Sequence, residues 1–136
     1  MTDAWHRPLA HIRGDELTTD TGQTSGMTRW EAISGKRLGS DRLWMGRTHV
    51  APGASSGNHH HGDTETAIYV VEGHPVFVFA DERTGDEVRL ETAPGDFIFV
   101  PPHTPHREEN PTGAEAVVVI ARSSQEAVVV NVESLG

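Results

Sequence analysis

Histidine is the residue type in this chain whose spacing could support chemistry. His59 and His61 lie two positions apart in an extended stretch, so their imidazoles project from one face and could share one ion, while His60 points the other way. A Pro-rich turn precedes His106, and we expect this turn to fold the side chain back toward the interior. Three imidazoles from two separated strands are the minimum for a stable first-row metal site with open positions for a substrate. We therefore predict that His59, His61 and His106 bind a metal ion and take part in catalysis.

The composition limits what else could form a site. The chain has 136 residues with 9 histidines and no cysteine, which excludes disulfides, thiolate metal sites and cysteine nucleophiles. Its net charge of −9 repels phosphate backbones, so we expect no nucleic-acid partner. No apolar run approaches the ~20 residues of a membrane helix, and residues 1–20 lack the apolar stretch of a signal peptide. We therefore expect a cytoplasmic protein without membrane contact.

Short strands must position these histidines. No window of 11 or more residues keeps a 3.6-residue apolar period, so we predict no substantial helix. Dense turn signals separate short runs rich in β-branched and aromatic residues, which predicts an all-β antiparallel sandwich or barrel. The predicted strands are Trp30–Ile33, Leu43–Val50, Thr66–Val71, Val76–Ala80, Glu87–Glu91, Phe97–Val100, Ala116–Ala121 and Ala127–Val132.

The length indicates one domain, preceded by a short arm. Residues 1–27 are rich in Thr, Asp and Gly and are expected to form an N-terminal arm, and residues 28–136 the barrel domain. The runs 117–120 and 128–130 are apolar without alternation, so both faces of those strands should be covered. Together with the arm, these runs predict a homodimer.

Both histidine segments resemble the paired motifs of the cupin superfamily. The first motif, G-x5-H-x-H-x3–4-E-x6-G, is matched by Gly53, His59, His61 and Gly73. The second motif, G-x5-P-x-G-x2-H-x3-N, is matched by Gly95, Pro101, His106 and Asn110, with His103 where the family usually has glycine. The resemblance covers roughly residues 43–121. It implies a jelly-roll barrel with a metal held by two histidines of the first motif and one of the second.

The fourth ligand of that motif is where this sequence departs from the family. Counting back from Gly73, the usual glutamate position is occupied by Thr66, and Glu65 lies one residue early. A shift of one residue turns a strand side chain to the other face, so Glu65 binds only if a bulge turns it inward. Otherwise no carboxylate binds, and His103 or His49 could take the place. We favour the second alternative.

The ligand set decides the chemistry that we expect. A divalent ion with three or four neutral imidazoles keeps nearly its full charge and is a good Lewis acid for carbonyl groups. Zn²⁺ in such a site suits aldol-type cyclisation, isomerisation or lyase chemistry. Fe²⁺, Mn²⁺ or Ni²⁺ on the same ligands could instead bind O2 and an enol.

The predicted strands next to the motifs indicate an apolar cavity and a hydrophobic small-molecule substrate. On alternating parity, half of the following residues should face inward: Ile68, Val70, Val76, Phe77, Val78, Phe79, Phe97 and Phe99. The histidine triplet and the extra histidine also resemble the actinomycete polyketide cyclases, which implies a cyclase for an aromatic, polyketide-like poly-β-carbonyl chain. The alternatives are a quercetinase-like dioxygenase, an isomerase or lyase, and a non-catalytic ligand-binding cupin.

Overall fold

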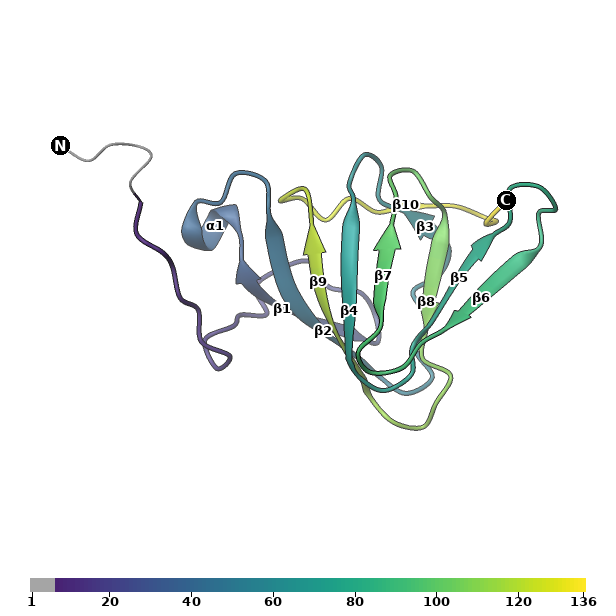
Figure 1. Ribbon diagram of the computed structural model, residues 1–136, viewed down its shortest axis with the longest axis horizontal. Helices are drawn as coiled ribbons and strands as arrows, with labels where there is room; N and C mark the ends of the chain where they lie inside the picture. The colour runs from purple at the N-terminus through teal and green to yellow at the C-terminus, as the bar shows by residue number, and fades with distance from the viewer. Residues whose placement is uncertain (1–6) are drawn as a thin grey trace.

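Two five-stranded antiparallel sheets face each other in the computed structural model, which describes residues 7–136 (Figure 1). The first sheet has the order β1 (Met27–Ile33), β2 (Trp44–Val50), β9 (Ala116–Arg122), β4 (Thr66–Glu72) and β7 (Phe97–Val100). The second has the order β10 (Val130–Asn131), β3 (His59–His60), β8 (His106–Glu109), β5 (Val76–Ala80) and β6 (Glu87–Glu91). The only helix among the described residues is the single turn α1 (Gly35–Leu38). The predicted all-β antiparallel sandwich is confirmed.

Two strands that the sequence did not reveal belong to the second sheet. β3 and β8 consist of His, Arg and Glu residues, so they lack the β-branched and aromatic residues by which the other strands were predicted. The predicted strand Ala127–Val132 shortens to the two residues of β10, at the edge of its sheet. Val129 and Val130 are 50% and 42% exposed in the single chain, so only a second subunit could cover both faces of residues 128–130. The homodimer itself stays a prediction.

The register of the first sheet decides which side chains face the second sheet. Alternate residues of β2 are buried: Trp44, Gly46, Thr48 and Val50. Residues directly opposite these on β1 and β9 share their face. Arg29 lies opposite Thr48, and Arg122 lies opposite Trp44, so both arginines belong to the inner face of the sandwich.

Gly46 leaves room for an aromatic side chain on this inner face. A Cβ at position 46 would collide with the Trp30 carbonyl oxygen and lie 2.7 Å from the Trp44 ring. Because glycine has no such atom, the Trp44 ring lies across position 46 and its Nε1 donates to Oε1 of the buried Glu31 at 2.9 Å. The Oγ of Ser34 donates to the other carboxylate oxygen at 2.8 Å.

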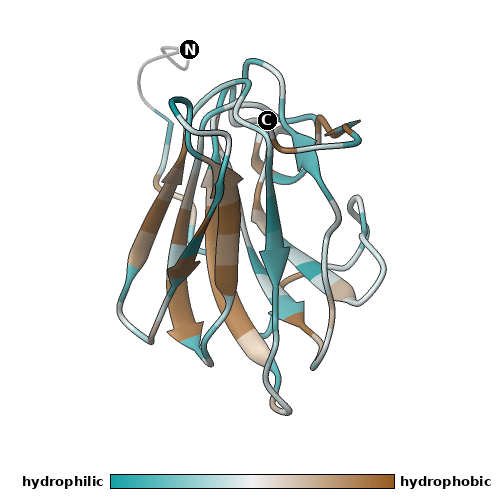
Figure 2. Ribbon diagram, turned by 90° about the vertical axis from the view of Figure 1, so that its right-hand side faces the viewer, coloured by the Kyte–Doolittle hydropathy of each residue, from teal (hydrophilic) through white to brown (hydrophobic). Residues whose placement is uncertain are grey.

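The apolar core lies between the sheets. Its largest cluster contains Ile68, Val70, Phe77, Val100 and Val118, with Ile98 and Ile120 packed against it. Figure 2 shows apolar residues gathered in strands rather than in the connecting loops. Burial of such side chains is the main favourable term that holds the two sheets together.

The N-terminal residues leave the body of the sandwich. In Figure 1 the segment that begins at residue 7 runs away from the strands, and Leu9 is fully exposed. Nearer the body, an isolated bridge pairs Thr18 with Glu31 and another pairs Thr24 with Met27. No helix in residues 7–136 has the length and apolar character needed to cross a membrane.

Asn110, directly after β8, joins the end of β2 to the loop between β8 and β9 through a buried amide. Its Nδ2 donates to the carbonyls of Val50, Ala51 and Ala114 at 3.1, 3.3 and 2.8 Å, and its Oδ1 accepts from the Thr112 hydroxyl at 2.8 Å. The side chain is fully buried. Without it, three carbonyl groups would lose a donor in a place with little access to water.

We predict that Asn110→Ala lowers the free energy of unfolding by about 2–4 kcal/mol, because it leaves buried polar groups unpaired. Urea denaturation followed by tryptophan fluorescence measures the change. Asn131→Ala is the matched control, since Asn131 is exposed and its replacement should change the free energy by less than about 0.5 kcal/mol. Equal losses in both variants would contradict the role given to Asn110.

Candidate metal centre

The structure brings His59, His61 and His106 together. His59 and His106 are direct partners across β3 and β8, and His61 follows the end of β3. The ring centroids lie 4.8 Å apart for His59–His61, 4.5 Å for His59–His106 and 5.1 Å for His61–His106. One ring nitrogen from each residue lies within 4.8 Å of the other two.

Each of these rings is oriented by a backbone carbonyl. The Nδ1 atoms of His59, His61 and His106 lie 2.9, 2.8 and 2.9 Å from the carbonyl oxygens of Gly57, Val128 and Thr104. A carbonyl oxygen can only accept, so each Nδ1 carries the proton and each Nε2 keeps its lone pair. The other nitrogen of a metal-binding histidine makes this kind of hydrogen bond in metalloproteins.

Burial keeps the three rings neutral. His59 and His106 are each 8% exposed, and loss of solvation lowers the pKa of His59, of His61 and, to about 4, of His106. A neutral imidazole is the form that binds a metal, whereas a protonated ring has no free lone pair. The donor set therefore fits a divalent first-row ion: three neutral imidazoles, with the Nε2 lone pairs left free by the carbonyl contacts.

Thr66, not Glu65, faces this centre. Thr66 is 7% exposed and lines the cavity that contains the three histidines. Glu65 is exposed, and its backbone exchanges two hydrogen bonds with Ser123. No bulge occurs between Glu65 and the inward-facing residues Thr66 and Ile68, so the carboxylate points away from the histidines.

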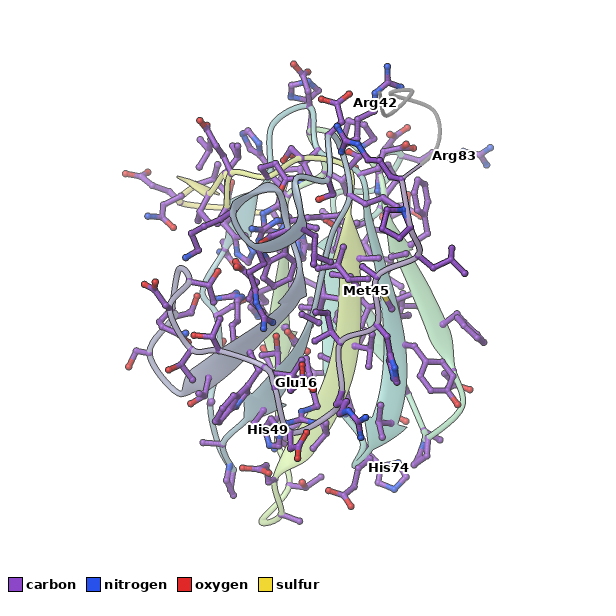
Figure 3. The ribbon with its side chains drawn as sticks, turned by 90° about the vertical axis from the view of Figure 1, so that its left-hand side faces the viewer. Glu16, Arg42, Met45, His49, His74 and Arg83 are labelled. Carbon is purple, nitrogen blue, oxygen red and sulfur yellow. The ribbon has the colours of Figure 1, made fainter. Side chains whose placement is uncertain are left out.

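Neither of the other two expected fourth ligands joins the group. His103 is exposed in the turn between β7 and β8, where its Nε2 lies 2.6 Å from Oδ1 of Asp63. Its φ of 59° lies in the left-handed region, which glycine adopts more readily than other residues. His49 lies on the outer face of β2, with its Nδ1 2.8 Å from the Glu115 carboxylate. Figure 3 shows His49 toward the lower end of the molecule, whereas β3 lies at the upper end in Figure 1.

The cavity around the histidines has a volume of about 270 Å³ and is more polar than the sequence predicted. Of the eight expected wall residues, only Ile68 and Phe77 line it. Phe97 and Phe99 point outward and are 78% and 60% exposed. Apolar atoms still make up the larger part of its lining, as expected, but the side chains of Arg29, Glu108 and Arg122 also line it, and these charged groups were not expected.

Glu108 is an acidic residue of the cavity that was not predicted from the sequence. It is the second residue after His106 on β8, so both side chains point between the sheets. Its Oε1 is buried without a hydrogen-bond partner, and burial raises the pKa of Glu108 to about 7, against the opposing charge of Arg29. Because residues two apart on a strand face the same side, the position of Glu108 two residues after His106 is the signal that could have identified it.

A second and wider hollow adjoins the first. Its volume is about 570 Å³, and it shares Phe77, Val100 and His106 with the histidine cavity. The remainder of its wall is largely apolar and includes Phe79, Leu90, Ile98 and Phe99. The expected aromatic wall thus exists in part, but beside the histidine cavity rather than around it.

Comparisons with known proteins agree with this architecture. The family model of the cupin domain matches residues 46–122. The polyketide cyclase RemF from Streptomyces resistomycificus superimposes with a TM-score of 0.71 at 24% identity, over 92% of this chain and 86% of that protein. Oxalate oxidase in complex with glycolate superimposes with a TM-score of 0.68 at 21% identity, over 83% of this chain but only 60% of that protein.

Similarity of fold extends to proteins of other activity. Peruvianin-I, a cysteine peptidase from the latex of Thevetia peruviana, has a TM-score of 0.71 at 17% identity and covers 93% of this chain and 78% of its own. The present chain has no cysteine at all. Likeness at these identities therefore shows the fold alone. No curated protein sequence matches the chain.

We predict that Glu108→Gln stabilises the metal-free protein at pH 8 but hardly at pH 4.5. Since the pKa of Glu108 is raised to about 7, the folded protein binds more protons than the unfolded chain between pH 4.5 and 7, and stability is lost as the pH rises through that window. The advantage of the variant in unfolding free energy should grow by about 3 kcal/mol from pH 4.5 to 8. Chemical denaturation at both pH values measures it.

Glu109→Gln is the control for this prediction, with the opposite sign. Hydrogen bonds from Arg107 and Arg89 lower the pKa of Glu109, so its contribution to stability is present above the unfolded pKa and lost as the pH falls. Glu109→Gln should therefore become less stable than the parent protein as the pH rises. A pH-independent difference for Glu108→Gln would contradict the burial of an unpaired carboxyl group.

Proposed function

The chain belongs to the cupin domain family, and we propose that it is a metal-dependent cyclase within it. The substrate would be an aromatic, polyketide-like compound with several β-carbonyl groups, and the reaction an aldol-type ring closure. The observation that carries this proposal is the set of three carbonyl-oriented, neutral imidazoles with a threonine where a carboxylate ligand would otherwise stand.

The absence of a carboxylate from this group of ligands matters for the charge of the centre. The described residues offer no Asp or Glu oxygen within the histidine group, so a bound cation would keep nearly all of its charge. When bound, a divalent ion supplies Lewis-acid polarisation of the substrate carbonyl groups. We propose Zn²⁺ as this ion, because three imidazoles and an open position match its usual catalytic coordination; Fe²⁺, Mn²⁺ and Ni²⁺ fit the same donors.

The protein's own residues would orient the substrate and accept its proton. Glu108 lines the same cavity as the histidines, and its Oε1 has no hydrogen-bond partner, so this carboxylate would accept a proton lost from an α-carbon. Ile68, Phe77 and Ile120 exclude water from one side of the cavity. The adjoining apolar hollow would hold the aromatic body of the substrate, next to His106.

The structural neighbours support the proposal without deciding it. A polyketide cyclase is among the proteins that share this fold over most of both chains. Oxalate oxidase shares it as well, and Bacillus subtilis oxalate decarboxylase has Mn(II) centres. The fold is thus found with more than one reaction, so the reaction must be measured on this protein.

The test of the proposal is a product analysis with the Zn²⁺-loaded protein and a synthetic aryl poly-β-ketone. We expect a cyclised product that differs from the substrate by the loss of water only, with no O2 consumed. O2 uptake in step with substrate loss would instead establish a dioxygenase. Tight retention of the ketone without any turnover would indicate a binding protein. O2 uptake or retention without turnover would each overturn the proposal of a cyclase.

Metal binding itself can be tested separately from turnover. We predict that His61→Ala weakens Zn²⁺ binding more than about 100-fold, because even the outer partners of metal ligands contribute 10–100-fold. Competition with a chromogenic chelator measures the affinity. His60→Ala is the matched control: His60 is adjacent in the chain, but its ring lies 6.0 Å from that of His103 and outside the histidine group. Equal losses in the two variants would contradict the ligand assignment.

A further inference from the structure

Two arginines share the cavity of the three histidines. Arg29 comes from β1 and Arg122 from the end of β9, and both line the same 270 Å³ space. Neither residue forms an ion pair within 4.0 Å among residues 7–136, although both arginines of the second sheet, Arg89 and Arg107, do so. A guanidinium group placed between two sheets without a carboxylate is costly, so its position calls for an explanation.

Arg29 is held by neutral groups only. Its Nη1 donates to the Thr24 hydroxyl at 2.8 Å and to the Gly22 carbonyl at 3.5 Å. Burial lowers the pKa of Arg29, and Glu108 is the acidic group whose charge opposes that effect. Because Glu108 forms no ion pair with it, part of the guanidinium remains available toward the cavity.

Arg122 is likewise held by neutral groups and has no anionic partner within 4.0 Å among the described residues. Its Nε donates to the Ser124 carbonyl at 3.2 Å and its Nη2 to the Gln125 carbonyl at 3.1 Å. The guanidinium carbon lies 4.0 Å from the centre of the Trp44 ring. The nearby Glu31 already accepts hydrogen bonds at both oxygens, from Trp44 and Ser34.

The charges in this cavity do not balance. Arg29 and Arg122 are close enough for the charge of Arg29 to disfavour that of Arg122, and a divalent ion on the histidines would add to the positive field. Glu108 is the one acidic residue in the lining. A ligand with a negative charge would therefore be attracted to the space between the histidines and the two arginines.

We propose that Arg29 and Arg122 form an anion subsite for a carboxylate of the ligand, next to the oxygen atoms that meet the metal. The ligand is then a carboxylic acid with a neighbouring oxygen function, and its apolar part lies against Ile68 and Phe77. A planar carboxylate suits guanidinium donors, and the small volume and apolar neighbours favour it over a bulkier phosphate. This inference names the substrate class of the proposed enzyme, but the subsite can be measured without the metal.

The test uses metal-free protein and salicylate, with salicylamide as its neutral analogue, followed by titration calorimetry. We expect salicylate to bind at least about 10-fold more tightly than salicylamide. Arg29→Gln and Arg122→Gln should each weaken salicylate binding about 10-fold or more and leave salicylamide binding unchanged. Arg29→Lys, which keeps the charge, should retain part of the affinity.

Arg47→Gln is the matched control, because Arg47 lies on the outer face of β2 beside Trp30, much as Arg122 lies beside Trp44. It should bind salicylate as the parent protein does. The subsite would be overturned by equal affinity for salicylate and salicylamide, or by a loss of salicylate affinity in Arg47→Gln as large as in the Arg29 and Arg122 variants. Tighter binding of phenyl phosphate than of salicylate would overturn the assignment of the subsite to a carboxylate.

This inference and the proposed function fail in different ways. Salicylate binding that depends on Arg29 and Arg122 but brings no turnover of the ketone would support the subsite and reject the cyclase. Zn²⁺-dependent ring closure of the ketone with no preference for salicylate over its amide would reject the subsite alone.

Discussion

The candidate site depends on three hydrogen bonds from histidine Nδ1 atoms to backbone carbonyl groups. These bonds decide which nitrogen of His59, His61 and His106 carries the proton, and they turn the three unprotonated nitrogens toward one space. The carbonyls belong to three separate segments, near residues 57, 104 and 128. The long connection after β9 therefore contributes to the site although it supplies no ligand itself.

Burial gives this arrangement its chemical character. Loss of solvation keeps the histidines neutral, holds a carboxyl group at position 108 with a raised pKa, and leaves two guanidinium groups without counter-ions. Water alone would satisfy the polar groups of this cavity poorly, whereas a cation on the histidines with an anionic ligand on the arginines would satisfy them well. The apolar core beside it, from Ile68 to Phe77, limits the space and keeps the effective dielectric constant low.

The sequence predicted those parts of the molecule that local patterns encode. Most apolar strands, from Thr66 to Val100, were found because they are short runs of β-branched and aromatic residues between turn signals, and the spacing of His59 and His61 places two rings on one face. The strands β3 and β8 could not be found in that way, since polar residues form them. Arg29 and Arg122 were missed for a different reason: they enter the site from strands that are distant in the chain, and only the register of the first sheet reveals that both face inward.

One measurement tests the central claim, that three neutral histidines present Nε2 to a common ion. Long-range proton–nitrogen NMR of the metal-free protein at pH 7 identifies the tautomer of each ring, and addition of Zn²⁺ shows which nitrogens respond. The account predicts a proton on Nδ1 of His59, His61 and His106, and a shift of the three Nε2 resonances with one equivalent of Zn²⁺. A proton on Nε2 in these rings, or a response confined to other histidines, would contradict it.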